Sequence, residues 1–120
     1  VYPDEVAAVC MAKILGRPVK FVADRLESFS SDIHARDHRL KGRIAVMNDG
    51  RIVGFDIDDL TGIGPYSVYP RTSAVEGNQV VNLCGGPYAF EHYRCTTRVV
   101  LQNKTPTCQY RAVGHPIATT

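Results

Sequence analysis

Residues 38–58 read HRLKGRIAVMNDGRIVGFDID, and this stretch decides the fold class. Apolar or small side chains alternate with charged ones on both sides of Asn48-Asp49-Gly50. A turn triplet of this kind between two alternating runs is a hairpin signal. The stretch therefore predicts two antiparallel strands, with one face buried and the other in solvent.

The chain is expected to begin with a helix from Pro3 to Leu15, because proline suits the first helical turn. Asp4 and Glu5 complement the positive end of the helix dipole, and Gly16 is placed to end the helix. Apolar residues recur at helical spacing, and we expect this stripe to fill the core. The stripe comprises Ala7, Cys10, Met11, Ile14 and Leu15.

Four other segments carry weaker patterns. Val19 to Ala23 is short, apolar and β-branched, which predicts a buried strand. Asp24 to Ser31 is expected to make a helical turn, and Ser73 to Leu83 is ambiguous, with helix preferred. Tyr93 to Gln102 alternates and predicts another strand. A helix, a hairpin and further mixed strands indicate the α+β class.

Composition excludes several function classes. The chain has 120 residues, 44% hydrophobic and 22% charged, with a formal net charge of +2. So small a charge does not mark a general binder of nucleic acid or acidic membranes. No run approaches the ~20 apolar residues that span a bilayer. Because the chain starts at Val1 without an initiator Met, we expect an internal fragment of a longer protein.

The cysteines are Cys10, Cys84, Cys95 and Cys108, and no two of them form a Cys-x-x-Cys pair. Structural zinc sites and iron–sulfur clusters usually need such local pairs. We therefore expect free thiols packed as small hydrophobic groups in a reducing compartment. This predicts a cytoplasmic location, with the periplasm as the alternative.

Two groups of polar residues suggest metal sites but have simpler explanations. His34-x-x-x-His38 would align two imidazoles on a helix, but the Glu of a zinc-protease motif is absent. We expect these histidines to be solvated. Asp56, Asp58 and Asp59 lack the spaced oxygen ligands of a calcium loop, so we expect a solvated strand face.

Two further motifs are too weak to carry a function. Gly62-Ile63-Gly64 lacks the third glycine of a phosphate-binding fingerprint. A short basic stripe lacks the interleaved aromatic residues of a nucleic-acid interface. The stripe comprises Arg36, Arg39, Lys41 and Arg43.

The segment from Pro106 to Pro116 reads PTCQYRAVGHP and is too rich in Pro and Gly to continue a helix or strand. Arg111 and the neighbouring backbone N–H groups suit an anionic ligand that accepts many hydrogen bonds. From spacing alone, Arg111 could equally pair with a carboxylate while Tyr110 packs in the core. Both interpretations stay open at the level of the residues.

This segment resembles the Tyr-Arg-Gly-x-Gly-x-Pro loop in the molybdopterin-binding large subunit of the family of xanthine dehydrogenase, aldehyde oxidase and carbon monoxide dehydrogenase. The similarity continues through residues 2–5 (YPDE), 16–20 (GRPVK) and 24–27 (DRLE). It therefore covers essentially the whole chain. It implies that residues 1–120 are an internal part of a larger α+β molybdopterin-binding domain, without a separate domain boundary.

The resemblance implies a molybdenum hydroxylase, an oxidoreductase that hydroxylates a substrate carbon with oxygen derived from water. Its cofactor would be molybdopterin, in the simple form or as the cytosine dinucleotide. Electrons would pass to [2Fe–2S] clusters and FAD in partner subunits or domains, so we expect a hetero-oligomer. The alternative is a non-catalytic scaffold module of the same fold without bound metal.

The resemblance also implies roles for individual residues. Gln109, Tyr110, Arg111 and Gly114 fall where the family's arginine loop touches the cofactor. Gln79 and Val113 fall in the substrate pocket. None of these six is assigned as a metal ligand.

At three positions this chain differs from members of the family with known substrates, and these differences narrow the expected substrate class. Copper-containing carbon monoxide dehydrogenases place a cysteine where this chain has Ala112, so we do not expect a Mo–Cu site. Xanthine-oxidising members carry an aromatic residue at Val113 and an arginine near Gln79. We therefore expect an aldehyde or an N-heterocycle rather than a purine.

The catalytic machinery implied by the resemblance is not within this chain. The family's Phe-Gly segment should precede Val1, and its catalytic glutamate should follow Thr120. Glu5, Glu27, Glu76 and Glu91 are not candidates for that base. The fragment alone is therefore predicted to be inactive, with no catalytic residue of its own.

Overall fold

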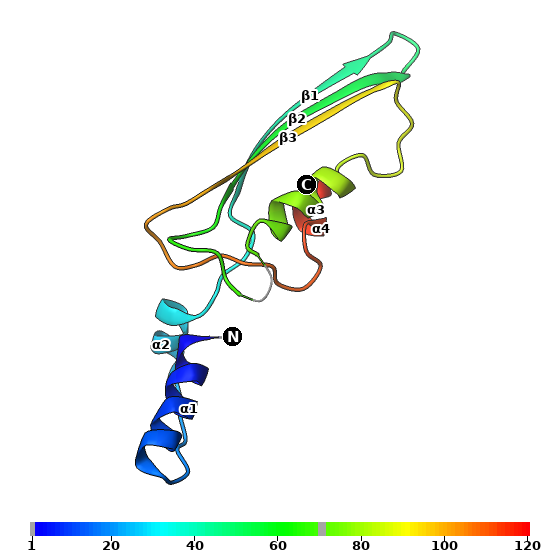
Figure 1. The fold of residues 1–120 in the computed structure, drawn as a ribbon. Coiled ribbons are helices and arrows are strands. Elements are labelled where there is room, and N and C mark those ends of the chain that lie inside the picture. Colours follow the sequence, from blue (N-terminus) through cyan, green and yellow to red (C-terminus); the bar gives the residue numbers. More distant parts are fainter. Residues whose placement is uncertain (1, 70–71) are drawn as a thin grey trace.

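The computed structural model describes residues 2–69 and 72–120, which form an elongated body measuring 72 × 25 × 24 Å (Figure 1). Helices and strands combine in an α+β arrangement, as predicted. In chain order the elements are α1 (Pro3–Leu15), α2 (Arg25–Ser31), β1 (His38–Val46), β2 (Ile52–Gly62), α3 (Val75–Leu83), β3 (His92–Val100) and α4 (His115–Ala118).

The predicted hairpin forms β1 and β2 of a three-stranded sheet with the order β1-β2-β3. β1 and β2 pair antiparallel, with Gly42 opposite Ile57. β2 and β3 pair parallel, with Ile57 opposite Cys95. A parallel pair needs a long crossover, and α3 supplies it along one face of the sheet (Figure 1). The preferred helix at residues 73–83 is thus confirmed.

The outer face of the sheet is charged and exposed. Asp56 on β2 accepts hydrogen bonds from Arg43 on β1 and from Arg94 on β3, and these two guanidiniums hold the pKa of Asp56 far below its usual range. Arg98 donates to Asp58 at 2.7 Å. Carboxylates on the neighbouring strand therefore balance part of the basic stripe seen in the sequence.

The inner face holds the small apolar core, in which Ile57 packs against Val80 and Cys84 of α3. Burial raises the pKa of the Cys84 thiol to about 11, so it stays protonated at neutral pH. Phe55, Phe90 and Tyr93 extend the core with ring centroids 5.6–6.2 Å apart. Tilted and offset aromatic pairs at these distances are favourable.

Beside this apolar core lies a buried polar cluster, which corrects two predictions. The side chain of His38 is only 1% exposed and Asp59 is fully buried, although both were expected to be solvated. His38 Nδ1 lies 3.0 Å from Asp59 Oδ1, and hydroxyls of Thr61 and Thr97 donate to Asp59 Oδ2. Burial acts to raise the pKa of Asp59, but the bonds from His38 and Thr61 outweigh it and lower the pKa.

α3 can approach this cluster closely because residue 77 is glycine. A Cβ atom at Gly77 would lie 2.9 Å from the hydroxyl oxygens of Thr61 and Thr97. Such a distance is too short for carbon against a side chain of a neighbouring strand. The glycine therefore sets the spacing between the helix and the polar part of the sheet.

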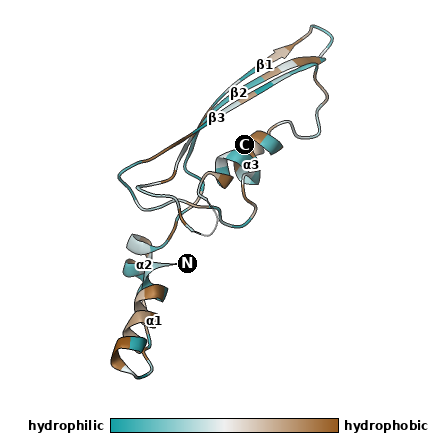
Figure 2. Cartoon of the chain, viewed as in Figure 1, coloured by the Kyte–Doolittle hydropathy of each residue, from teal (hydrophilic) through white to brown (hydrophobic). Residues whose placement is uncertain are grey.

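α1 and α2 stand apart from the sheet (Figure 1), and here the sequence predictions are partly wrong. α1 forms as expected, but none of its residues is buried, so its apolar stripe does not fill the core. Figure 2 shows these hydrophobic residues along α1. Residues 19–23 belong to neither a helix nor a strand, so the strand predicted there does not form.

α2 confirms the predicted helical turn after residue 23. Asp24 Oδ1 accepts from the Glu27 backbone N–H at 2.9 Å, and Glu27 Oε2 accepts from the Asp24 N–H at 2.8 Å. This reciprocal capping box satisfies two N–H groups that a helix start otherwise leaves unpaired.

The four cysteines are free thiols, as predicted. Cys84 and Cys108 are buried, whereas Cys10 on α1 is exposed, so the expectation of packed thiols is wrong for Cys10. None of the described helices has the length and apolar composition needed to cross a membrane.

His38 and His34 offer a matched pair for testing the buried cluster. Replacing His38 by Leu should destabilise the full-length protein by about 3 kcal/mol, because Asp59 would keep its charge without its partner. His34 is exposed, and within residues 2–69 and 72–120 its ring makes a single hydrogen-bond contact, to the Phe29 carbonyl at 3.2 Å. His34→Leu should stay within about 0.5 kcal/mol of wild type in denaturant unfolding. Equal losses of stability in the two variants would contradict the special role of His38.

Candidate functional site

The segment singled out in the sequence, residues 106–116, begins as an extended strand-like stretch held from two sides. The His34 N–H donates to the Pro106 carbonyl at 3.0 Å, and the Cys108 N–H donates to the His34 carbonyl at 2.9 Å. From the other side, the Thr107 N–H donates to the Ile63 carbonyl at 3.0 Å. The Gly-Ile-Gly motif at residues 62–64 therefore serves to support this loop through its backbone.

After Cys108 the loop contains several hydrogen-bond donors that have no acceptor among the described residues. The backbone N–H groups of residues 109–113 donate to no protein acceptor in the described part of the chain. The Arg111 side chain is exposed and has no ion pair or hydrogen bond with another described residue. The possibility that Arg111 merely pairs with a carboxylate therefore has no support within residues 2–69 and 72–120.

The side chains around Arg111 are also placed toward solvent. Tyr110 is 64% exposed, so it does not pack in the core of this chain. Gln109 is half-buried, and its Oε1 accepts a hydrogen bond from the Cys108 thiol at 2.6 Å. This contact occupies the amide oxygen and leaves the amide NH₂ as a donor.

The structure brings the other two sequence candidates next to this loop. A Cβ atom at Gly114 would lie 2.6 Å from the Gln79 Cβ and 3.0 Å from the Val80 backbone nitrogen. The loop thus touches the backbone of α3 at Gln79, which only glycine permits at residue 114. Val113 immediately precedes this contact and is half-buried. All six candidate residues therefore belong to one continuous region formed by the loop and α3.

Ala112 has an unusual backbone conformation, with φ = 60°. This left-handed region favours glycine, because the Cβ atom of other residues crowds the following carbonyl. The sequence motif to which the loop is similar has glycine here, and the positive φ explains that preference. A methyl group at residue 112 also leaves the position without any metal-binding atom.

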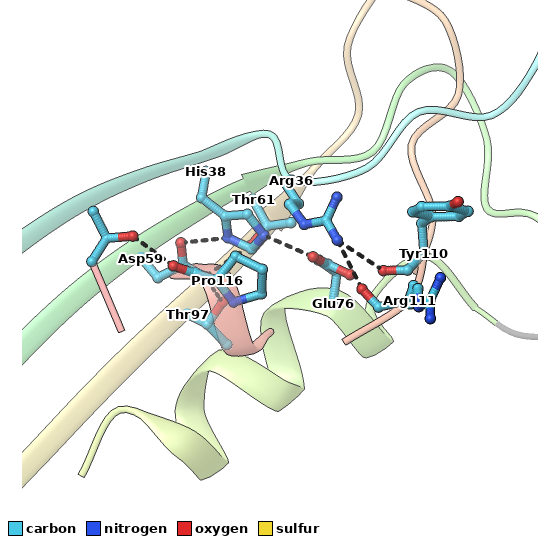
Figure 3. A network of polar contacts seen from close by, with 10 residues as sticks. Arg36, His38, Asp59, Thr61, Glu76, Thr97, Tyr110, Arg111 and Pro116 are labelled. Carbon is cyan, nitrogen blue, oxygen red and sulfur yellow. Dashed lines mark hydrogen bonds and ion pairs between the residues drawn. The ribbon is translucent and has the colours of Figure 1, made fainter. Parts of the chain in front are cut away.

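Sequence reasoning missed Arg36, which it grouped with the basic stripe of β1. Arg36 lies two residues before β1, and its guanidinium donates to the backbone carbonyls of Tyr110 and Arg111 (Figure 3). No local sequence signal predicts this contact, because the partners are 74 and 75 residues apart.

Sequence reasoning also missed the buried carboxylate of Glu76 behind the loop. Glu76 is 1% exposed, and neither carboxylate oxygen has a hydrogen-bond partner among the described residues. The imidazole of His38 lies beside it, with Nε2 3.8 Å from Glu76 Oε1, and this Nε2 likewise has no hydrogen-bond partner among the described residues (Figure 3).

The donor set of the loop determines what the region can bind. It offers a guanidinium, a free amide NH₂ and a run of unpaired backbone N–H groups. Charge-assisted donors and oriented backbone amides recognise anions, above all phosphate. The residues present therefore fit an anionic ligand with many hydrogen-bond acceptors, such as a phosphorylated pterin.

Comparison with known proteins agrees with this interpretation. The model of the family described as "Molybdopterin cofactor-binding domain" matches residues 1–120. The chain is 31% identical over 106 residues to the carbon monoxide dehydrogenase large chain of Hydrogenophaga pseudoflava, which is 88% of this chain and 13% of that protein. It is 33% identical over 114 residues to the 6-hydroxypseudooxynicotine dehydrogenase complex subunit gamma of Paenarthrobacter nicotinovorans, which is 95% of this chain and 14% of that protein.

Among solved structures, quinoline 2-oxidoreductase from Pseudomonas putida 86 is similar with a TM-score of 0.86 and 33% identity. The match covers 93% of this chain and 14% of that one. The chain therefore spans about a seventh of the length of the relatives it matches.

The strain at Ala112 predicts that glycine is the better residue there. Ala112→Gly should stabilise the full-length protein by about 0.5–1 kcal/mol, because relief of the left-handed strain exceeds the added entropy of the unfolded chain. Ala7→Gly, the same change on the exposed surface of α1, should destabilise by about 0.5–1 kcal/mol. Thermal unfolding of both variants measures the difference. A loss of stability in Ala112→Gly would be inconsistent with the strain.

Proposed function

Because the chain belongs to the family of molybdopterin cofactor-binding domains, we propose that residues 109–114 hold the pterin of a molybdenum cofactor. One observation carries the proposal. Five successive backbone N–H groups, at residues 109–113, are free of protein acceptors beside the exposed Arg111 guanidinium. When bound, the cofactor supplies the chemistry of hydroxylating a substrate carbon with water-derived oxygen and accepts the electrons.

Each residue of the loop has a distinct role in this proposal. Arg111 binds the phosphate of molybdopterin or of its cytosine dinucleotide, since a guanidinium matches phosphate oxygens with two parallel hydrogen bonds. The free amide NH₂ of Gln109 donates to a pterin acceptor, and the sulfur contact of its Oε1 holds the amide in that orientation. Tyr110 covers the cofactor with its exposed ring. Gly114 lets the loop lie against α3.

Gln79 and Val113 line the substrate pocket in this proposal, because they lie on either side of the contact between α3 and the loop. Gln79 carries no charge and Val113 no aromatic ring, so neither offers the arginine or the ring expected for a purine. A neutral amide beside an aliphatic side chain suits an apolar ring with one polar atom.

The substrate class is an N-heterocycle or an aldehyde. The name of the similar quinoline 2-oxidoreductase supports a heterocycle, quinoline being one. The chain is also similar to a carbon monoxide dehydrogenase large chain. A solved carbon monoxide dehydrogenase that it matches is described as containing copper and molybdenum. Ala112 argues against copper here, because a methyl group cannot ligate a metal.

The remaining parts of the enzyme belong to the rest of the protein. Residues 1–120 are an internal part of one cofactor-binding domain, and they contribute no catalytic base in this proposal. Electrons leave through [2Fe–2S] and FAD partners in a hetero-oligomer, as the names of the relatives, a "large chain" and a "complex subunit", support. The free cysteines support a cytoplasmic location.

Cofactor content tests the proposed function. The full-length protein in its native complex should contain molybdenum by elemental analysis, and oxidised pterin by fluorescence after extraction. Arg111→Ala should lower both at least about tenfold, because a charge-assisted contact with phosphate is lost. Arg51→Ala is the control, since Arg51 pairs with Asp49 at the hairpin turn. A wild-type protein without molybdenum and pterin would instead favour the scaffold alternative.

Isotope incorporation tests the substrate class. The complex should convert quinoline or an aromatic aldehyde in ¹⁸O-labelled water, with an artificial electron acceptor, to a product that carries the label. It should not oxidise carbon monoxide, because the residue after Arg111 cannot bind copper. Oxidation of carbon monoxide, together with bound copper, would overturn this assignment.

A further inference from the structure

Arg36 joins two strained segments. Arg36 and Ala112 are the non-glycine residues with positive φ in the described part of the chain, at 67° and 60°. The Arg36 guanidinium donates to the carbonyl of Arg111, which precedes Ala112, at 2.8 Å, and to the Tyr110 carbonyl at 3.4 Å. Strained backbone persists only where surrounding contacts enforce it, and it gathers at functional sites. The side chain of one strained residue, Arg36, thus contacts the peptide group that directly precedes the other, Ala112.

The contact determines where the next N–H groups point. In a trans peptide the carbonyl and the following N–H lie on opposite sides. When the Tyr110 and Arg111 carbonyls turn toward Arg36, the N–H groups of Arg111 and Ala112 must turn away from it. Both belong to the set that donates to no described protein acceptor. Arg36 therefore selects the side on which the loop offers its donors.

Arg36 is itself held by backbone contacts on both sides. Two residues earlier, His34 exchanges backbone hydrogen bonds with Pro106 and Cys108 at 3.0 and 2.9 Å. One residue later, the Asp37 carbonyl accepts from the Gly62 N–H at 3.0 Å. These contacts fix the chain on either side of the left-handed residue. The guanidinium also lies 5.8 Å from the centroid of the Tyr110 ring, a favourable cation–π arrangement.

We propose that Arg36 is a positioning residue that holds the backbone of Tyr110 and Arg111 so that the N–H groups of residues 111 and 112 bind the pterin cofactor. This inference rests on the proposed function of the loop. Arg36 contacts the carbonyl groups of Tyr110 and Arg111, on the side of the loop opposite to the N–H groups of residues 111 and 112. In this proposal it donates no hydrogen bond to the cofactor. Without the guanidinium, the two peptide units are free to rotate, and the cofactor loses oriented donors rather than a charge that it contacts.

The rate of pterin release from the full-length complex tests this role. Arg36→Ala should speed pterin release about tenfold, as expected for losing one strong charge-assisted hydrogen bond. The midpoint of thermal unfolding should stay close to that of the control Arg51→Ala. Arg36→Lys keeps the charge but not the fork of donors, so its release rate should lie between those of wild type and Arg36→Ala.

Repeating the Arg36 substitution in the Ala112→Gly variant separates a positioning role of Arg36 from an effect on overall stability. In Ala112→Gly the left-handed conformation costs little, so removing the guanidinium should accelerate pterin release less than in wild type. Equal acceleration in both backgrounds would overturn the positioning role. If Arg36→Ala does not fold, Arg36→Lys decides the matter, and a wild-type release rate in that variant overturns the inference.

The outcomes also separate this inference from the proposed function. A wild-type complex that holds neither molybdenum nor pterin contradicts the proposed function itself. A wild-type complex that holds both, with an Arg36→Ala variant that releases pterin at the wild-type rate, contradicts only the role of Arg36.

Discussion

The buried hydrogen bond between His38 and Asp59 is the interaction on which the placement of the site depends. It ties the start of β1 to the C-terminal half of β2, and Asp59 also accepts from Thr97 of β3. Burying a carboxylate is costly unless its hydrogen bonds are satisfied, so the cluster fixes one register of all three strands. Arg36 lies two residues before His38, so its backbone is close to this rigidly held point at the start of β1.

α3 transmits this order to the proposed cofactor loop. It meets the polar cluster at Gly77, and it meets the loop at Gln79, two residues further along the same helix. The loop is held in turn by β-type contacts to residues 34 and 63 before it reaches its free donors. A site of this kind is precise because rigid elements hold its backbone, while its side chains stay available.

Local sequence signals predicted the elements whose causes are local. The hairpin was predicted from alternation and a turn triplet, and the predicted helical turn forms as α2 over a capping box. Both predictions hold because neighbouring residues decide these elements. Two predictions that required a tertiary partner failed. The apolar stripe of α1 and the extended segment at residues 19–23 found none among the described elements.

The features of the candidate site also divide into those that the sequence determined and those that only the tertiary structure decided. Sequence alone identified the candidate loop with Arg111 and the family to which the chain belongs, because these depend on residue identity at fixed spacing. Only the tertiary structure decided that Arg36 holds the loop, that Gln79 lies against Gly114, and that Asp59 is buried rather than solvated. These contacts join residues far apart in the chain, which no local pattern encodes.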